Sequence, residues 1–240
     1  MTSMLDGVLL VNKPQGPTSH DVVMVVRRAL GVRQIGHGGT LDPMATGVLV
    51  LLVGRATKQQ QRVHGCRKQY DTVIRFGQQT DTGDAWGTVT IEAAVPDLSD
   101  RPRLDAALAA CRGELLQQPP AFSAVKVQGR PLYWWARRGE PKSAPARPVT
   151  IYALELLEVG ANQLRCRIEC SSGTYVRTLA ERIAQQLGSV GHVVELTRLS
   201  VGSWRLDEAC AFDWLRQASR EEVGARLRAL EWHDAAVPRA

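Results

Sequence analysis

Residues Gly36–Gly54, GHGGTLDPMATGVLVLLVG, join a glycine-rich loop directly to a run of apolar side chains. The first dozen positions hold four glycines, one histidine and one aspartate, Asp42. The six apolar residues Val48–Val53 predict a buried strand, because nothing in the run alternates with polar residues. A chain with this stretch must enclose a central strand while leaving a carboxylate on the loop before it.

Helix and strand patterns alternate irregularly along the rest of the chain, which predicts an α+β fold. Ser19 is a candidate cap for a helix with an apolar stripe that includes Val22 and Val26 and ends at Gly31. The predicted strands are residues 7–13, 47–53, 68–77, 88–93, 148–159, 162–170 and 192–204. The predicted helices are residues 19–30, 55–65, 102–111, 174–187 and 221–232.

Positive charge is in excess and is concentrated in one segment. Thirty Lys and Arg against 24 Asp and Glu give a net charge of +6, which favours a polyanionic partner such as nucleic acid. Between Arg101 and Arg147 there are nine basic and three acidic residues, with Tyr133, Trp134 and Trp135 among them. Such a segment suits an RNA surface that stacks on bases and binds phosphates. An amphipathic helix over residues 131–138 with inward aromatics is an equal alternative, although proline and glycine flanks favour a protruding segment.

The remaining composition points to a soluble, cytoplasmic protein. The five cysteines form no CxxC pair, and their odd number fits reduced thiols better than a disulfide framework. The N-terminus lacks the basic region of a signal peptide. The apolar runs of the chain are far shorter than the roughly 20 residues that span a bilayer, so we expect no membrane partner.

Three chemical interpretations of the Asp42 loop compete. A phosphate loop is disfavoured, because the segment lacks GK[ST] and GxGxxG spacing and a strand follows it. A metal site is disfavoured, because His37 and Asp42 have no third His or Cys nearby. An isolated carboxylate remains, and it can act as a nucleophile, a base or a stabiliser of a cationic sugar. Taken alone, however, an Asp-Pro pair is more often an ordinary turn.

The stretch GHGGTLDPMATGVL is similar to the catalytic motif of the TruB family of tRNA pseudouridine synthases. Four further stretches resemble the family in the same order over roughly residues 5–205: GVLLVNKPQGPTSHDVV, KQYDTVIRFGQQTDTGDAWG, KVQGRPLYWWARRG, and SSGTYVRTLAERIAQQLG followed by HVVELTRLSVG. The resemblance implies a pseudouridine synthase fold, with a mixed, mostly antiparallel sheet in two halves flanked by helices. A central cleft would lie between the halves.

The resemblance also implies the reaction. One uridine in the T loop of tRNA, at position 55, would be isomerised to pseudouridine without a metal or another cofactor. Asp42 would be the catalytic aspartate, either adding to C1′ of the ribose or removing the C2′ proton to give a glycal. Because the uridine is stacked inside a folded tRNA, it must be extruded before the carboxylate reaches it.

Other site residues carry over by position in the matching motifs. Tyr70 would stack on the target base, Tyr175 would lie near it, and Arg177 would pair with Asp42. His37 would hold the RNA in its flipped state, Asp84 would hydrogen-bond His37, and Leu196 would line the uracil pocket. Each also has an ordinary structural alternative, such as a core tyrosine or a solvated helix arginine. The expected contacts with the RNA backbone come from Lys13, Lys126, Arg130, Arg137, Arg138 and Lys142.

We expect residues 1–205 to form the catalytic domain, with an RNA-binding insertion at residues 118–148. Residues 206–240 would be a short C-terminal extension, without the PUA-type domain into which many family members continue. The expected partner is the T stem-loop and elbow of tRNA, bound by a monomer. A non-catalytic tRNA-binding or folding protein is the alternative. Asp42, Tyr70 and Arg177 together favour the enzyme, because binding alone needs no buried carboxylate facing a polyanion.

Overall fold

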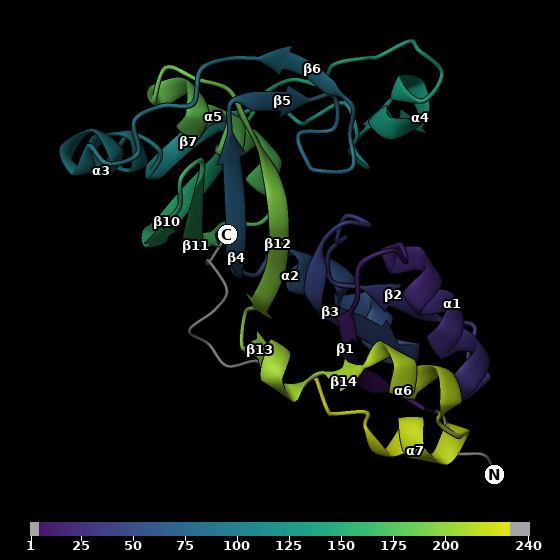
Figure 1. The fold of residues 1–240 in the computed structure, drawn as a ribbon. Coiled ribbons are helices and arrows are strands. Elements are labelled where there is room, and N and C mark those ends of the chain that lie inside the picture. Colours follow the sequence, from purple (N-terminus) through teal and green to yellow (C-terminus); the bar gives the residue numbers. More distant parts are fainter. Residues whose placement is uncertain (1–4, 231–240) are drawn as a thin grey trace. The chain divides into compact units, whose positions relative to one another are not determined.

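The computed structural model describes residues 5–230 and divides into two compact units (Figure 1). Unit 1 comprises Met1–Tyr70 and Thr197–Ala240, and unit 2 comprises Asp71–Leu196. The chain passes from unit 1 into unit 2 within β4 (Lys68–Phe76) and returns within β12 (Gly191–Val201). The described part of residues 206–240, which we expected to be an extension, groups with unit 1.

The core of unit 1 is the pair formed by β1 (Gly7–Lys13) and β3 (Thr46–Val53). The strands are antiparallel, with their register running from Gly7↔Val53 to Lys13↔Gly47. No residue of Val48–Val53 is more than 1% exposed, which confirms the buried strand predicted from the apolar run. Alternate residues of both strands, among them Leu10 and Val50, pack into one hydrophobic cluster with Trp204.

Shorter strands complete the sheet of unit 1. β14 (Cys210–Ala211) pairs with β1 in parallel, and β2 (Ile35–His37) pairs with β3 antiparallel. The C-terminal part of β12 pairs with the start of β3 in parallel, and β13 (Trp204–Arg205) returns along β12. Parallel and antiparallel pairs therefore coexist, as the predicted mixed sheet requires.

Helix α1 (Ser19–Leu30) forms where its apolar stripe predicted it, but its cap differs from our expectation. Thr18, not Ser19, is the N-cap: its hydroxyl accepts from the Asp21 amide, and the Asp21 carboxylate accepts from the Thr18 amide. Gly31 ends the helix with φ 63°, a left-handed conformation suited to glycine. Ser19 is the first helical residue, so its side chain is available for another partner.

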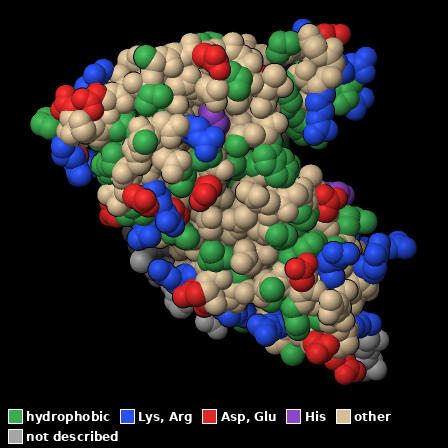
Figure 2. Space-filling view, viewed as in Figure 1, with side chains coloured by type: hydrophobic (Ala, Val, Ile, Leu, Met, Phe, Trp, Pro, Cys, Tyr) green, Lys and Arg blue, Asp and Glu red, His purple; other side chains and the backbone are tan. Residues whose placement is uncertain are grey.

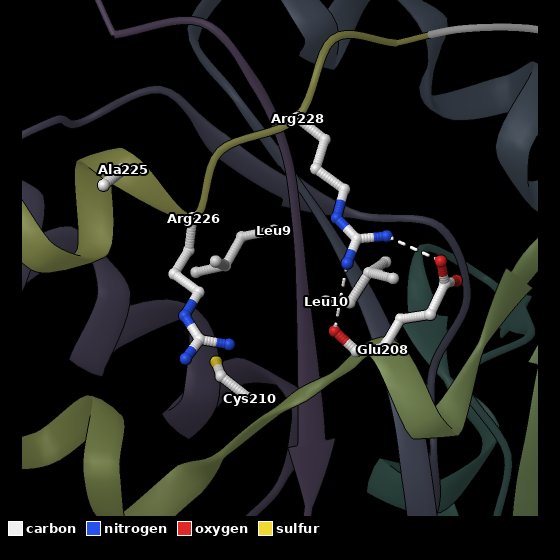
Figure 3. A pocket seen from close by; sticks show the side chains of 7 residues that line it. All are labelled: Leu9, Leu10, Glu208, Cys210, Ala225, Arg226 and Arg228. Carbon is white, nitrogen blue, oxygen red and sulfur yellow. Dashed lines mark hydrogen bonds and ion pairs between the residues drawn. The ribbon is translucent and has the colours of Figure 1, made fainter.

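The C-terminal segment folds back onto β1 through η2 (Leu206–Glu208), α6 (Phe212–Gln217) and α7 (Arg220–Ala225), and α1 contacts both α6 and α7. The predicted helix 221–232 is thus shorter, and its last two positions lie outside the described residues. The main chains of Val8 and Arg228 exchange two hydrogen bonds of 2.9 Å, and the Arg228 guanidinium binds Glu208 (Figure 3). A pocket of about 200 Å³ opens here, lined by Leu9, Leu10, Glu208, Cys210, Ala225, Arg226 and Arg228.

Unit 2 is built on four adjacent strands in the order β4, β11 (Gln163–Cys170), β10 (Arg147–Val159) and β7 (Gly113–Gln117). β10 pairs antiparallel with both β11 and β7. Helices α3 (Arg101–Ala109) and α5 (Val176–Gln186) contact each other, and β5 (Gln78–Thr80) forms a hairpin with β6 (Val89–Glu92).

An insertion between β7 and β10 holds the hairpin of β8 (Lys126–Val127) and β9 (Arg130–Pro131), followed by α4 (Leu132–Ala136). In unit 1, η1 (Gly54–Gln59) and α2 (Gln60–Gly65) follow β3. The α+β class is confirmed. No helix in the described part of the chain is long and apolar enough to cross a membrane.

Gly47 is a specific requirement of this fold, because β3 approaches the backbone of β12 there. Its φ is +109°, and a Cβ would lie 2.5 Å from the Arg198 amide nitrogen and closer still to the Arg198 carbonyl oxygen. We expect Gly47→Ala to lower the free energy of unfolding by about 3 kcal/mol, through backbone strain and a clash that no side chain can relieve.

Gly65→Ala is the matched control for urea denaturation. A Cβ at Gly65 meets no atom within 4 Å, so we expect a change of no more than about 0.5 kcal/mol. Equal effects of the two substitutions would show that the approach of β3 to β12 is not constrained.

Candidate active site

The loop that carries Asp42 lies between β2 and β3 in unit 1, and its main chain is held at each position around the aspartate. The Ser19 hydroxyl accepts from the Leu41 amide (2.8 Å) and donates to the Leu41 carbonyl (3.1 Å). The Asp42 carbonyl accepts from the Ala45 amide (3.0 Å), and the Pro43 carbonyl accepts from the Gly16 amide (2.9 Å). The half-buried Asp42 side chain therefore projects from a fixed backbone.

Two buried cations bind carbonyls of this loop and of the segments beside it. Arg198, 1% exposed, donates to the carbonyls of Gly39 (3.1 Å), Thr40 (3.2 Å) and Val48 (2.9 Å). Lys13 is fully buried, and its ammonium group donates to the carbonyls of Pro14 (2.8 Å), Pro17 (2.9 Å) and Pro43 (3.3 Å). These donors take the place of the water or strand partners that loop carbonyls otherwise need.

The position of Lys13 changes its assigned role. We expected it to contact the RNA backbone, but its side chain is fully buried and its ammonium group is directed at three carbonyls. Burial lowers the pKa of Lys13 to about 8, the negative charge of Asp42 raises it in part, and the positive charge of Arg198 lowers it again. Lys13 therefore holds the Asp42 loop through the Pro43 carbonyl, and its ammonium group lies within the electrostatic field of the Asp42 carboxylate.

His37 and Tyr70 are the other predicted site residues of unit 1. Tyr70 lies on β4 and is 7% exposed. The pKa of His37 is lowered, first by burial and then by the positive charge of Arg198. Among the residues that the structure describes, the buried Nδ1 of His37 has no hydrogen-bond partner. The lowered pKa favours the neutral form of the imidazole.

Arg177 and Asp84 lie together in unit 2. Arg177, 3% exposed, donates to the carbonyls of Thr82 (2.6 Å) and Phe122 (2.9 Å). Its Nε lies 3.9 Å from an Asp84 carboxylate oxygen, and that carboxylate accepts from the Thr82 hydroxyl (2.8 Å) and the Trp86 amide (3.1 Å). The solvated helix arginine that the sequence left open is thus excluded.

The predicted site residues form two sets. In unit 1 they are Lys13, His37, Asp42 and Tyr70; in unit 2 they are Asp84, Tyr175, Arg177 and Leu196, of which Leu196 is buried on β12 and Tyr175 is half-buried. No group of three or more His, Cys, Asp or Glu residues suited to a metal ion occurs within residues 5–230. The roles of Ser19 and Arg198 were not predicted from the sequence. The signal for Arg198 was a charged residue inside a predicted strand.

The basic insertion of unit 2 carries cations on aromatic rings. The Arg138 and Arg130 guanidinium carbons lie 4.7 and 5.3 Å from the Trp134 ring centroid. Arg137 lies 5.5 Å from the Tyr133 ring and Lys142 lies 5.3 Å from the Trp135 ring. All five cations predicted to bind RNA here, Lys126, Arg130, Arg137, Arg138 and Lys142, are exposed. Figure 2 shows Lys and Arg side chains beside hydrophobic ones in this region.

This arrangement bears on the alternative in which the aromatic residues of the insertion simply pack inward. Leu132 is the buried residue of α4, whereas Tyr133 is 41% exposed. The Trp135 indole donates to the Val127 carbonyl (3.1 Å) and so ties α4 to the β8–β9 hairpin. The aromatic rings do not simply pack inward, because they also support the cations at the surface.

The sequence of the whole chain has clear relatives. Residues 27–176 match the family described as TruB family pseudouridylate synthase (N terminal domain), which is more than half of the chain. The chain belongs to the TruB family. It is 46% identical to the tRNA pseudouridine synthase B of Aromatoleum aromaticum, over 96% of this chain and 75% of that protein. It is 41% identical to the tRNA pseudouridine synthase B of Opitutus terrae, over 93% of this chain and 92% of that protein.

A solved structure agrees with this assignment. The crystal structure of a Cbf5-Nop10-Gar1 complex superposes with a TM-score of 0.69 and 26% identity, covering 94% of this chain and 60% of that chain. The predicted TruB resemblance and pseudouridine synthase fold are therefore confirmed. As a member of the TruB family, the chain is a pseudouridine synthase, and pseudouridine synthases are isomerases.

The buried ammonium group of this TruB-family chain makes its stability depend on pH. The pKa of Lys13 is about 8 in the folded chain against an ordinary value of 10.5. Between these values the unfolded chain binds the proton and the folded chain does not, so stability rises with pH through this window. We expect the free energy of unfolding, relative to Lys13→Met, to rise by up to about 3 kcal/mol from pH 7 to pH 10.5.

Urea denaturation of both proteins at a series of pH values measures this difference. Lys126→Met is the control, because Lys126 is exposed, and its difference from the unsubstituted chain should stay flat with pH. A flat difference for Lys13→Met as well would contradict the lowered pKa.

Proposed function

We propose that this chain isomerises uridine 55 in the T loop of tRNA to pseudouridine, with Asp42 as the catalytic carboxylate. The observation that carries the proposal is the loop itself, where Ser19, Lys13 and Arg198 fix the main chain on both sides of a half-buried aspartate. A backbone held at this many points can keep one carboxylate in a fixed position against a ribose, as catalysis by proximity and orientation requires. The names of the relatives support tRNA as the substrate.

The reaction requires a carboxylate of this kind. Breaking the N1–C1′ bond develops positive charge on the ribose, which a neighbouring carboxylate stabilises. The uracil then turns and rejoins through C5, which loses a proton while N1 gains one, so the product has the same atoms as the substrate. Asp42 has two possible roles: it adds to C1′, or it removes the C2′ proton to give a glycal. Neither role calls for an oxidant, a reductant or a metal.

The surrounding residues have proposed roles in holding the extruded nucleotide. Tyr70 stacks on the uracil and Tyr175 lies near it, Leu196 lines the uracil pocket, and Arg177 pairs with Asp42. His37 contacts the flipped RNA. Asp84 hydrogen-bonds His37 in the working enzyme.

The basic insertion binds the tRNA backbone. Its five exposed cations pair with phosphates of the T stem-loop, which draws the positively charged chain to its polyanionic partner. We propose that one molecule of the enzyme acts alone, in the cytoplasm. A tRNA-binding or folding protein without catalysis would use the same cations, so Asp42, together with Tyr70 and Arg177, distinguishes the two functions.

Asp42→Asn should reduce pseudouridine formation by at least about 1,000-fold, because a neutral amide neither stabilises the ribose cation nor acts as nucleophile or base. Binding of tRNA should stay within a few-fold. The measurement is incubation with unmodified tRNA followed by pseudouridine mapping through a chemical adduct and primer extension. Asp105→Asn, at an exposed position paired with Arg101, is the matched control and should keep full turnover. Turnover by Asp42→Asn would exclude the proposed mechanism.

Replacing Arg137, Arg138 and Lys142 together by Gln should weaken tRNA binding and flatten its salt dependence. Each lost phosphate contact lowers the slope of log K against log salt by about 0.7 to 0.9. The measurement is a binding titration at several salt concentrations. The control replaces Arg28, Arg216 and Arg220, three exposed cations of unit 1, by Gln. If both triple variants changed the slope of log K against log salt equally, the proposal that the insertion in particular binds tRNA would be contradicted.

A further inference from the structure

One buried side chain holds the main chain of Tyr175. Gln117 is the last residue of β7 and is 3% exposed. Its Oε1 accepts from the Tyr175 amide (3.0 Å), and its Nε2 donates to the Tyr175 carbonyl (3.3 Å). The side-chain amide of Gln117 thus binds both polar main-chain groups of a single residue.

Tyr175 needs this partner because of its place in the fold. It is the N-cap of α5, with φ −99° and ψ 109°, and its own side chain makes no capping hydrogen bond. Its carbonyl also accepts from the Leu179 amide (3.1 Å), but its own amide lies outside the helical ladder. The Gln117 amide presents an oxygen and an N–H side by side, as a paired strand residue does, so two bonds fix the peptide planes around Tyr175.

The same segment holds Arg177 as well. The Phe122 carbonyl accepts from Nη2 of Arg177 (2.9 Å), so residues 117–122 hold two members of the GTYVR motif. Tyr175 and Arg177 are two positions apart, and this segment binds the main chain of the first and the guanidinium group of the second. Residues 123–125 connect this segment to the β8–β9 hairpin of the insertion that we propose to bind RNA.

We infer that Gln117 is a positioning residue, which fixes the main chain of Tyr175 and thereby orients its phenol ring for the extruded uracil. The inference rests on the role of Tyr175 in the proposed function. Gln117 itself is too buried to touch RNA and acts only through Tyr175. If Gln117 only stabilised the fold, its replacement would have the same effect whether or not the Tyr175 ring is present.

A double-mutant cycle between Gln117 and Tyr175 separates these possibilities. Gln117→Met keeps the length of the side chain and removes both hydrogen bonds. Its kcat should fall roughly 10-fold while KM changes less than about 2-fold, because a small misplacement of a positioning group slows the reaction step. In a Tyr175→Leu background the same change should lower kcat by less than about 2-fold, because the ring to be positioned is gone.

Ser189→Ala is the matched control, since Ser189 is a buried residue of unit 2 whose hydroxyl donates to the Ala94 carbonyl (2.6 Å). It should leave kcat unchanged in both backgrounds. An equal loss for Gln117→Met with and without the Tyr175 ring, or no loss at all, would overturn the inference. Turnover by Asp42→Asn would instead reject the proposed mechanism, and the double-mutant cycle between Gln117 and Tyr175 could still be interpreted.

Amide hydrogen exchange tests the clamp without any reaction. The Tyr175 amide should be protected in the unsubstituted chain and should exchange at least about 10-fold faster in Gln117→Met, because its acceptor is lost. A Tyr175 amide that exchanges freely in the unsubstituted chain would overturn the inference, whether or not the Gln117 variant folds.

Discussion

The site around Asp42 depends on buried cations that bind main-chain carbonyls. A glycine-rich loop has carbonyl groups that no strand partner satisfies, and leaving them unpaired in a buried place costs about 1–3 kcal/mol each. Lys13 and Arg198 together donate to six carbonyls, and those of Gly39, Thr40 and Pro43 lie in this loop. Burying an ammonium group also has a cost, and the lowered pKa of Lys13 reflects it. The hydrogen bonds offset this cost, and the loop keeps one shape.

The same solution recurs elsewhere in both units. Lys68 in unit 1 donates to the carbonyls of His64 and Cys66, and Arg177 in unit 2 donates to those of Thr82 and Phe122. Long cationic side chains reach carbonyls that lie far apart in the sequence, as the Arg177 bonds show. A basic composition therefore serves two purposes here. Some cations lie on the surface, where a polyanion can reach them, and others hold irregular main chain inside the protein.

Periodicity predicted most of the fold, because the elements near the site have clean patterns. The apolar run of β3 and the stripe of α1 both form as expected, and so does the Gly31 helix end. The helix cap was one residue off, since Thr18 and Ser19 are both common capping residues and the capping box with Asp21 forms at Thr18. The motif GHGGTLDP located the Asp42 loop, and the family comparison supports that resemblance.

Long-range partners could not be predicted from the sequence. Nothing in NKPQGP indicates that three carbonyls converge on Lys13, so an exposed lysine was the ordinary expectation. Gln117 gave no signal either, because a glutamine at a strand end looks like any solvated residue until Tyr175 is found 58 positions later in the chain. Such contacts depend on how distant segments meet, which local patterns do not encode.

The cations that lie on aromatic rings in the insertion have a consequence for the thermodynamics of association. An arginine on a bare surface samples many rotamers, and fixing it on a phosphate costs about 0.5–1.5 kcal/mol of conformational entropy. Arg138, already seated 4.7 Å from an indole centroid, has given up part of that freedom during folding. In the complex with tRNA that we propose, the insertion would therefore be a preorganised surface, and a larger share of each ion pair would remain as net affinity.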